Sequence, residues 1–383
     1  MAGGRGATGM GDVAARIGEL VRKCDRCGAC LAVCPLYAQN GREIASPRGK
    51  IAVVRGLMDD GLAAVPALAE TFRFCLLCRA CTGSCPNKIP VAEIMIEARR
   101  YAAGQWGHPA RHRVIAALLG NDVLLGLMAG VLRWTRNAKP PAGGPSASGA
   151  PASRGQIAYF QGCAMRLFFP AASRATVQLL KRTGGVVVPP GVCCGSPHLA
   201  YGMVDQALAL ARKNIERFAG ADLVVTDCAS CGSSLKEYGS RLAGDPRWAD
   251  RALAFGRKVT GLSEYLFRAG YRPRGGLAAK VTYHDPCHLA RGQGIRNEPR
   301  DLLRLAGDYV ELPSAGRCCG GAGAFHLDYP AAAGGILRDK TADITRTGAA
   351  MVVTECPACL MQLGRGRRRE HGEFEVRHIS QVL

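Results

Sequence analysis

The chain has 383 residues, and 48% of them are hydrophobic, which is ordinary for a globular protein with buried cores. Its 50 Lys and Arg residues against 30 Asp and Glu residues give a net charge of +20. The N-terminus lacks the apolar stretch of a secretory signal, so we expect a cytoplasmic protein with reduced thiols. In such a compartment the 18 cysteines indicate metal binding or redox chemistry rather than a disulfide framework.

Two copies of one cysteine motif, CDRCGACLAVCP and CLLCRACTGSCP, lie near the N-terminus, 51 positions apart (75 minus 24). The run C-x2-C-x2-C-x3-C-P is typical of bacterial ferredoxins that bind [4Fe–4S] clusters. Zinc also binds C-x2-C pairs, but three successive steps with a C-P ending, present twice, favour iron–sulfur. The motif cysteines are Cys24, Cys27, Cys30 and Cys34 in the first copy and Cys75, Cys78, Cys81 and Cys85 in the second.

The fourth cysteine of such a motif ligates the other cluster in two-cluster ferredoxins. We therefore predict two [4Fe–4S] clusters, one held by Cys24, Cys27, Cys30 and Cys85 and the other by Cys34, Cys75, Cys78 and Cys81. The stretches SPRGKIAVVRGLMDDGL and VAEIMIEARRYAAG have apolar residues at helical spacing. Residues 1–109 are thus predicted to form an α-helical ferredoxin-like domain.

Residues 110–135 are predicted to form a connecting helix. Most of 114–134 is apolar, but Asn121 and Asp122 interrupt it near the middle, where a charge is costly in a bilayer. We expect an amphipathic or buried helix, with any membrane contact peripheral and at the inner face of the cell membrane. Residues 136–156 are rich in Pro, Gly, Ala and Ser and are predicted to be a flexible linker.

A second repeat occupies the rest of the chain. Short β-branched runs such as LVVT, KVTY and MVVT alternate with helical patterns. This alternation predicts two tandem α/β cysteine-rich domains, 157–275 and 276–383, each with an open sheet and cysteines at the strand ends, where such folds build sites. The repeated cysteines are Cys163, Cys193, Cys194, Cys228 and Cys231, echoed by Cys287, Cys318, Cys319, Cys356 and Cys359.

Each of these domains contains two adjacent cysteines, whose Cα atoms are too close for a relaxed disulfide. Five thiols exceed the needs of a tetrahedral zinc ion or a cubane cluster, and adjacent thiolates could bridge two irons of one cluster. We therefore expect further iron–sulfur clusters or zinc here, with a redox-active thiol pair and a purely structural role as alternatives. Gly195 and Gly320 are expected to let the backbone approach the metal.

Three histidines lie near these cysteines in the sequence: His198, His284 and His288. They could move protons or donate hydrogen bonds to a cluster. A structural role is an equal alternative, so no residue is assigned as catalytic.

The candidate nucleotide-binding motifs of this sequence lack the features that such motifs require. GRGATG at 4–9 follows no strand, GQGIRN at 292–297 lacks the third glycine, and there is no Walker A loop. We expect no bound nicotinamide or flavin, so electrons must enter from a partner. The densest basic run, GRGRRRE at 364–370, has no nucleic-acid-binding motif beside it, and we expect no nucleic acid partner.

The ferredoxin-type region, the linker and two C-x29–30-C-C-G-x32–35-C-x2-C repeats resemble the iron–sulfur subunit of glycolate oxidase. The repeats are also similar to those of heterodisulfide reductase and of the anaerobic glycerol-3-phosphate dehydrogenase iron–sulfur subunit, and SPRGKI at 46–51 favours the glycolate oxidase type. The resemblance implies an oxidoreductase component that is active only with a flavoprotein partner. That FAD-binding subunit would oxidise glycolate or a related 2-hydroxy acid such as D-lactate, and this chain would pass the electrons to a quinone or another carrier.

One feature departs from many glycolate-type subunits, whose repeats often lose cysteines. Both repeats here keep all five. In heterodisulfide reductases the same ten positions hold two noncubane clusters that cleave a disulfide. A thiol–disulfide reductase with chemistry at the paired cysteines is therefore the alternative function.

Overall fold

The computed structural model describes residues 17–59, 61–135, 157–189, 193–273 and 276–383, and the predicted linker lies outside them. The chain divides into two compact units. The first comprises Met1–Arg113 with Pro197–Val204 and Gly320–Ile336, and the second comprises Val114–Ser196, Asp205–Cys319 and Leu337–Leu383. The segment that follows each pair of adjacent cysteines thus belongs to the first unit, together with the two ferredoxin-type motifs.

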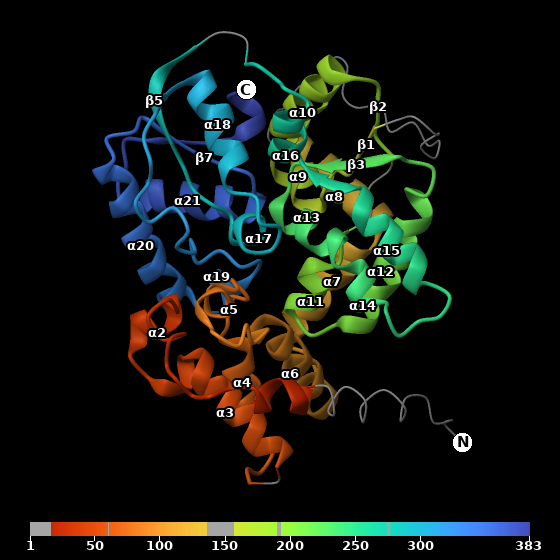
Figure 1. The fold of residues 1–383 in the computed structure, drawn as a ribbon, viewed down its shortest axis with the longest axis vertical. Coiled ribbons are helices and arrows are strands. Elements are labelled where there is room, and N and C mark those ends of the chain that lie inside the picture. The colour runs from red at the N-terminus through yellow and green to blue at the C-terminus, as the bar shows by residue number, and fades with distance from the viewer. Residues whose placement is uncertain (1–16, 60, 136–156, 190–192, 274–275) are drawn as a thin grey trace. The chain divides into compact units, whose positions relative to one another are not determined.

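The first unit is built from helices, as predicted (Figure 1). Helix α3 begins after Ser46, whose Oγ accepts a hydrogen bond from the Gly49 N–H at 2.9 Å. Its buried Ile51 packs in one core with Ile94 and Met95 of α6. The helices are α2 (Pro35–Asn40), η1 (Glu43–Ala45), α3 (Pro47–Met58), α4 (Ala67–Arg73), α5 (Ala80–Ser84), α6 (Val91–Trp106) and α19 (Phe325–Asp328).

Aromatic and polar contacts tie the two later segments into this unit. Phe74 packs edge-on against Tyr329, with ring centroids 4.9 Å apart. The His112 ring stacks on Tyr201 at 4.1 Å, and its Nε2 lies 2.9 Å from Asp328 Oδ2. The helices around the ferredoxin-type motifs therefore hold chain from both cysteine-rich repeats.

The second unit contains two four-stranded parallel sheets of identical topology. Their strand orders are β2-β1-β3-β4 and β6-β5-β7-β8, which confirms the predicted pair of α/β domains. Tyr159 pairs with Val225 in the first sheet, and Tyr283 pairs with Val353 in the second. The strands are β1 (Ile157–Tyr159), β2 (Val186–Val187), β3 (Leu223–Thr226), β4 (Val259–Gly261), β5 (Leu277–Tyr283), β6 (Gly307–Tyr309), β7 (Met351–Thr354) and β8 (Glu375–His378).

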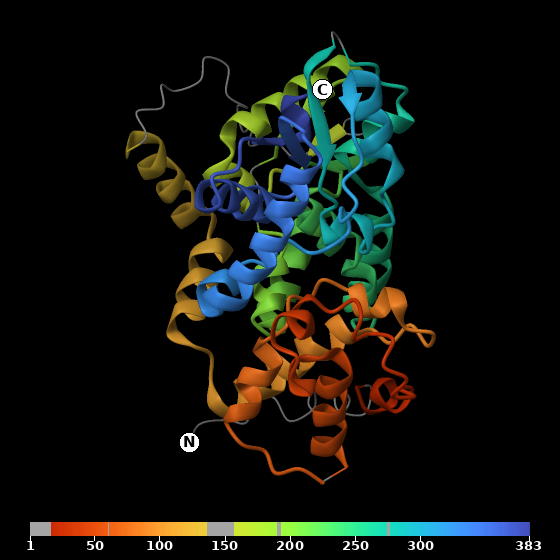
Figure 2. The ribbon, with the colours of Figure 1, turned by 90° about the vertical axis from the view of Figure 1, so that its left-hand side faces the viewer.

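Helices flank both sheets (Figures 1 and 2), because right-handed crossovers leave the central strands in opposite directions. In the second sheet, α18 contacts β5 and β6 while α21 contacts β8. The helices of this unit are α9 (Cys163–Phe168), α10 (Pro170–Thr183), α12 (Val204–Arg217), α13 (Ala229–Lys236), α14 (Tyr238–Arg241), α15 (Ala249–Lys258), α16 (Leu262–Arg268), α17 (Cys287–Ala290), α18 (Asn297–Ala306), α21 (Pro357–Arg369) and η2 (Ile379–Gln381). Two more helices are shared with the first unit: α11 (Ser196–Ala200), of which all but Ser196 belongs to the first unit, and α20 (Pro330–Arg346), which belongs to the first unit as far as Ile336.

The two sheets of the second unit share one hydrophobic core, which includes Tyr159, Val225, Tyr283 and Val353. Backbone contacts also join the repeats: the Ala229 N–H donates to the Glu355 carbonyl at 2.8 Å. The counterpart of Ala229 is Pro357, which has no N–H, and His378 Nε2 bonds to the Asp227 carbonyl instead, at 2.9 Å. The tandem domains are therefore one packed body rather than two independent ones.

The segment at 110–135, predicted as one connecting helix, forms two: α7 (Ala110–Gly120) and α8 (Asp122–Thr135). The Asn121 side chain caps α8, because its Oδ1 accepts hydrogen bonds from the Val123 and Leu124 N–H groups. Leu125 packs beside Cys163 and Cys193, while Val123 is 70% exposed. Among the described residues, no helix is long and apolar enough to cross a membrane.

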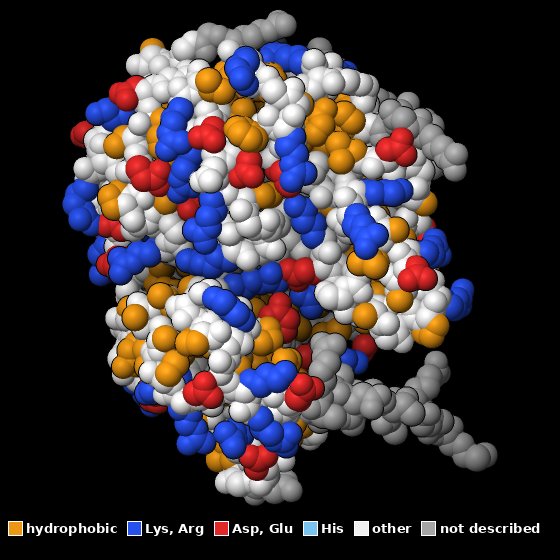
Figure 3. All heavy atoms as spheres, in the orientation of Figure 1, with side chains coloured by type: hydrophobic (Ala, Val, Ile, Leu, Met, Phe, Trp, Pro, Cys, Tyr) orange, Lys and Arg blue, Asp and Glu red, His pale blue; other side chains and the backbone are white. Residues whose placement is uncertain are grey.

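The basic excess is distributed rather than gathered on the face shown in Figure 3, where Lys and Arg side chains are spread among acidic and uncharged ones. Arginines of the described residues are engaged by carboxylates, as in the contact of Arg300 with Asp285 and Glu311, both at 2.8 Å.

Candidate metal centres

The eight cysteines of the ferredoxin-type motifs line two cavities. One cavity is lined by Cys24, Cys27, Cys30 and Cys85, and also by Cys81. The other is lined by Cys34, Cys75, Cys78 and Cys81. Each cavity thus contains three thiols of one motif and the fourth thiol of the other, the grouping that the ferredoxin pattern predicts. Four thiols around one cavity are a donor set that fits a [4Fe–4S] cluster.

The two cysteine loops share a backbone conformation that sequence analysis did not foresee. Arg26 (φ 57°) and Gly28 (φ 83°) in the first loop are left-handed, and so are Leu77 (φ 52°) and Arg79 (φ 59°) at the equivalent positions of the second. A left-handed conformation costs a non-glycine residue about 1 kcal/mol or more. The matching strain indicates that both loops are shaped for one purpose, to bring the intervening thiols to a common centre.

Buried cations adjoin the second of these cavities. Lys50 is 2% exposed, lines the cavity and donates a hydrogen bond to the Ala45 carbonyl. Burial lowers its pKa, and the thiols of Cys75 and Cys34 act in the opposite direction. A four-thiolate cluster is an anion, so a buried ammonium beside it compensates charge that solvent cannot reach.

Arg99 is the other buried cation of this region. Its guanidinium donates to the carbonyl of Cys75 at 2.6 Å and to that of Ala200, also at 2.6 Å. Burial lowers its pKa, but carbonyl acceptors from two chain segments, 72–75 and Ala200, hold the charged group in place. Arg99 therefore links the second cysteine loop to helix α11, which follows Cys194 in the chain.

The cavity of the first motif has a different charge pattern. Arg48 lines it but forms a two-pronged ion pair with Glu43, at 2.8 and 3.1 Å. Asn87 closes the same cavity by donating to the Lys23 carbonyl and to Asp25, both at 2.7 Å. The cation here is neutralised by its own carboxylate, unlike Lys50.

The cysteines of the tandem domains lie where the strand order of each sheet reverses. Cys163 and Cys228 follow the neighbouring strands β1 and β3, and Cys287 and Cys356 follow β5 and β7. In open α/β sheets the crevice at this reversal is where ligands bind, because the chain leaves the two strands toward opposite faces. The predicted position at the strand ends is confirmed for these four cysteines.

In the first repeat all five thiols are linked by contacts. The Cys163 and Cys193 sulfurs are 4.0 Å apart. Hydrogen bonds with Cys163 and Cys194, together with burial, raise the pKa of Cys193 well above its usual value. Hydrogen bonds with Cys194 and Cys228, together with burial, raise the pKa of Cys231 well above its usual value. A metal that binds here must displace these protons and supply the positive charge that stabilises thiolates.

Backbone anchors hold the adjacent cysteines of the first repeat. The Tyr238 hydroxyl and the Ser234 Oγ each donate to the Cys194 carbonyl at 2.9 Å, and Asn214 Nδ2 donates to the Cys193 carbonyl at 3.1 Å. These buried polar side chains fix the pair in one conformation, which preorganises a ligand set.

The glycine after each pair makes a turn that packs closely against a helix. Gly195 (φ 85°) and Gly320 (φ 80°) are left-handed, and added Cβ atoms would lie 3.3 Å from Ala207 backbone and 3.1 Å from the Ala333 carbonyl oxygen. Glycine is thus required for a sharp turn against a helix. The glycine that lets backbone approach a thiol is Gly162, whose Cβ would lie 2.8 Å from the Cys231 sulfur.

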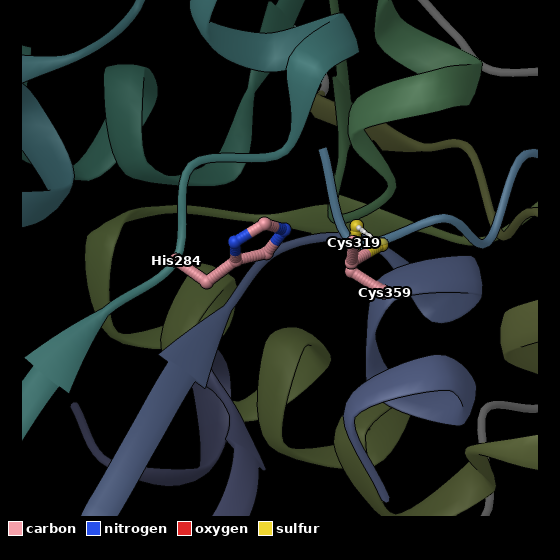
Figure 4. A group of neighbouring side chains, drawn as sticks. All are labelled: His284, Cys319 and Cys359. Carbon is pink, nitrogen blue, oxygen red and sulfur yellow. Dashed lines mark hydrogen bonds between the residues drawn. The ribbon is translucent and has the colours of Figure 1, made fainter. Parts of the chain in front are cut away.

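The second repeat brings His284, Cys319 and Cys359 together, with one donor atom of each within 4.8 Å of the others. The Cys319 thiol lies 3.5 Å from the Cys359 sulfur, and the His284 ring points toward both (Figure 4). Burial lowers the pKa of His284 well below its usual value, which favours the neutral imidazole that binds metals.

Polar groups surround the other thiols of this repeat. Hydrogen bonds from Cys359 and Ser230 lower the pKa of Cys356 to about 6, although burial acts in the opposite direction. The Ser230 Oγ lies 3.4 Å from that sulfur and 2.9 Å from His288 Nδ1. Lys340, which is buried, donates to the Ser314 carbonyl, and burial lowers its pKa to about 8.

Of the three histidines that sequence analysis singled out, only His284 joins a thiol group of this kind among the described residues. His288 bonds to Ser230, and His198 is buried in the first unit. Sequence analysis missed Lys50, Arg99 and Lys340. A lysine or arginine on the apolar face of a predicted helix was the available signal, and Lys50 beside Ile51 shows it most clearly.

Comparison with known proteins defines the class first. Residues 20–89 match the family model described as "4Fe-4S dicluster domain", and residues 157–236 and 281–364 match that described as "Cysteine-rich domain". The N-terminal region is thus a two-cluster [4Fe–4S] domain, followed by two cysteine-rich domains, as predicted.

Curated relatives define the family. The chain is 30% identical to the probable glycolate oxidase iron–sulfur subunit of Bacillus subtilis, over 96% of this chain and 94% of that one. It is 29% identical to the glycolate oxidase iron–sulfur subunit of Escherichia coli, over 95% and 94%. It is also 29% identical to one of the subunits of the fumarate reductase (CoM/CoB) of Methanothermobacter marburgensis, over 95% and 72%. The chain therefore belongs to this family of iron–sulfur subunits and is an oxidoreductase component.

A solved structure shares the fold. A hypothetical protein from Helicobacter pylori superposes with a TM-score of 0.58 at 9% identity, over 98% of this chain and 72% of that one. This likeness concerns the arrangement of the elements alone.

Proposed function

We propose that this chain is the electron-transfer subunit of a multi-subunit dehydrogenase that oxidises glycolate or a related 2-hydroxy acid such as D-lactate. A separate FAD-binding subunit performs the oxidation, and this chain carries the electrons to a quinone or another carrier at the inner face of the cell membrane. The observation that carries the proposal is the pair of cavities in which three cysteines of one motif meet the fourth cysteine of the other. The relatives that match over almost the whole chain point to the substrate class.

In this proposal each of the two cavities holds one cluster. Cys24, Cys27, Cys30 and Cys85 hold one [4Fe–4S] cluster, and Cys34, Cys75, Cys78 and Cys81 hold the other. Bound clusters supply one-electron transfer without proton or group transfer. The chain's own residues position the thiols, exclude water and, through Lys50 and Arg99, compensate the cluster charge.

The cysteine-rich domains hold further clusters in this proposal, one at each strand-order reversal. The ligands are Cys163, Cys193, Cys194, Cys228 and Cys231 in the first and Cys287, Cys318, Cys319, Cys356 and Cys359 in the second. Support comes from the contacts among the first five thiols and from the anchors on the Cys193 and Cys194 carbonyls. Arg99 adds a hydrogen-bonded connection from the second cysteine loop to helix α11, which begins two residues after Cys194.

The test starts from the chain purified anaerobically, alone and with its flavoprotein. Alone, it should contain iron and labile sulfide but should not oxidise glycolate or D-lactate with a dye acceptor. Copurification with an FAD-containing protein, and oxidation of one of these acids by the complex, are the expected results. Activity of the pure single chain, or a complex inactive with 2-hydroxy acids, contradicts the proposal.

A second candidate function is a thiol–disulfide reductase subunit of the heterodisulfide reductase type. It is favoured by the complete set of ten cysteines, nine of which are less than 10% exposed. The match to a subunit of fumarate reductase (CoM/CoB) is consistent with it. Disulfide reduction by the chain with a reduced dye as electron donor would support this alternative, and that activity should be lost in Cys319→Ser.

A further inference from the structure

The two cysteine-rich repeats differ at one position that faces the thiols. Tyr159 and Cys163 of the first repeat correspond to Tyr283 and Cys287 of the second, so Phe160 corresponds to His284. The backbone confirms this equivalence, because the Phe160 N–H donates to the Val225 carbonyl at 2.8 Å and the His284 N–H donates to the Val353 carbonyl at 2.9 Å. The same backbone site therefore carries a hydrocarbon ring in one repeat and an imidazole in the other.

The two side chains have different surroundings. Phe160 is fully buried and packs against the Phe218 ring, with centroids 5.5 Å apart. His284 is 1% exposed and points toward the sulfurs of Cys319 and Cys359 (Figure 4). A donor atom of each of these three residues lies within 4.8 Å of the others, close enough for all three to reach one metal ion.

A purely structural histidine does not account for this arrangement. Buried polar atoms in folded proteins are almost always hydrogen-bonded, because an unpaired one has lost its hydrogen bonds to water without replacement. His284 Nδ1 is buried and has no hydrogen-bond partner in the part of the chain that the structure describes. In Figure 4 the ring nitrogen nearer the two sulfurs is Nε2, so the unpaired Nδ1 lies on the other side of the ring and no hydrogen bond from it orients the imidazole. The orientation of Nε2 toward two thiols is explained by a ligand that it shares with them.

We propose that His284 is a ligand of the metal cluster at the second cysteine-rich repeat and binds the same iron as Cys319 and Cys359. This inference rests on the proposed function, which assigns an iron–sulfur cluster to that repeat. The first repeat, with Phe160 in the same place, binds its cluster through thiolates alone. The two sites are therefore chemically different despite their common fold.

The difference in ligands between the two repeats predicts a difference in the reduction potentials of their clusters. A neutral imidazole adds a ligand without adding negative charge, and histidine ligation raises the reduction potential of iron–sulfur centres relative to thiolate ligation. Lys340, buried in the same repeat, adds positive charge near Cys319. Of the two repeats, the second therefore holds the cluster of higher potential.

The test is pulsed electron paramagnetic resonance on the anaerobically prepared full chain with ¹⁵N-labelled histidine. The signal that disappears in Cys319→Ser identifies the second repeat. In the wild-type chain this signal should show a strongly coupled nitrogen, and His284→Phe, which copies the first repeat, should remove that coupling. His284→Cys supplies another ligand and should keep iron while losing the nitrogen coupling.

A matched control is His288→Phe, because His288 lies in the same loop but its Nδ1 is engaged by Ser230. It should keep the coupling. Coupling that persists in His284→Phe, or that is absent from the wild-type signal, overturns the histidine assignment while leaving the cluster in place. A wild-type chain with only about eight irons, the content of two four-iron clusters, refutes both this inference and the assignment of clusters to the repeats. Zinc at the site likewise overturns the proposal.

Discussion

The Cys231 sulfur lies 2.8 Å from the point that a Cβ atom would occupy on Gly162. Gly162 precedes Cys163 at the end of β1, and Cys231 lies in the first turn of α13. A methyl group at residue 162 would collide with the thiol and move either the sulfur or the loop. Glycine is therefore required here so that two segments far apart in the sequence can bring their cysteines together.

Gly162→Ala should reduce the iron bound by the first cysteine-rich repeat, because the displaced Cys231 thiol can no longer share a centre with its neighbours. Iron analysis of the anaerobically prepared chain, with spectra of the N-terminal clusters as internal reference, measures the effect. Gly185→Ala is the matched control, since a Cβ there meets nothing within 4 Å. Equal iron in the two variants would show that the close approach is irrelevant to metal binding.

Crossed ligation makes the fourth cysteine of each motif affect the other motif's cluster. Cys34→Ser should remove or alter the cluster of Cys75, Cys78 and Cys81, because those cysteines line the same cavity as Cys34. Cys85→Ser should instead affect the cluster of the first motif. Electron paramagnetic resonance of the two variants, compared with Cys30→Ser and Cys78→Ser, tests the pairing. It is wrong if Cys34→Ser reproduces the spectrum of Cys30→Ser.

The buried Lys50 should raise the reduction potential of the cluster in its cavity. Its Nζ lies 5.7 Å from the Phe74 ring centroid, away from solvent, so its charge is weakly screened. At an effective dielectric constant of about 20, a unit charge about 10 Å away contributes roughly 1–2 kcal/mol. Lys50→Met should therefore lower that potential by on the order of 50–100 mV, since about 59 mV corresponds to a tenfold change for one electron.

Potentiometric titration of both N-terminal clusters measures the effect of Lys50→Met. The cluster of Cys24, Cys27 and Cys30 should change less, because Lys50 does not line its cavity. Lys181→Met, which removes an exposed charge near the end of α10, is the control and should leave both potentials unchanged. Equal shifts at the two clusters would contradict the local role of Lys50.

Both members of each adjacent pair should be needed for a cluster in the tandem domains. Cys194→Ser should lower the iron content of these domains while the N-terminal clusters stay spectroscopically intact, because the two sets of thiols belong to different compact units. Cys319→Ser should do the same in the second repeat. A variant that keeps wild-type iron, sulfide and electron-transfer rate would remove the metal assignment for that repeat.

Several features followed from the sequence alone because they are local. Cysteine spacing within a loop is set by the number of residues between thiols, so the ferredoxin-type motifs could be recognised. Their crossed grouping is not local and was predicted from the known pattern of two-cluster ferredoxins. Alternating β-branched runs and amphipathic stretches likewise determine parallel strands and covering helices. The repeat itself was visible as VVTDCASC and VVTECPAC, which end β3 and β7.

Other features depend on contacts between distant segments. That 110–135 is two helices follows from the Asn121 cap, and the role of Gly162 follows from the Cys231 thiol that approaches it. Lys50 and Arg99 count as cluster neighbours only because packing buries them beside Cys34 and Cys75. In the sequence His284 is one of three histidines near the cysteines of the repeats. Only the fold, which joins the end of β5 to Cys319 and Cys359, separates it from the others, because burial and direction are set by the whole core and not by neighbours in the chain.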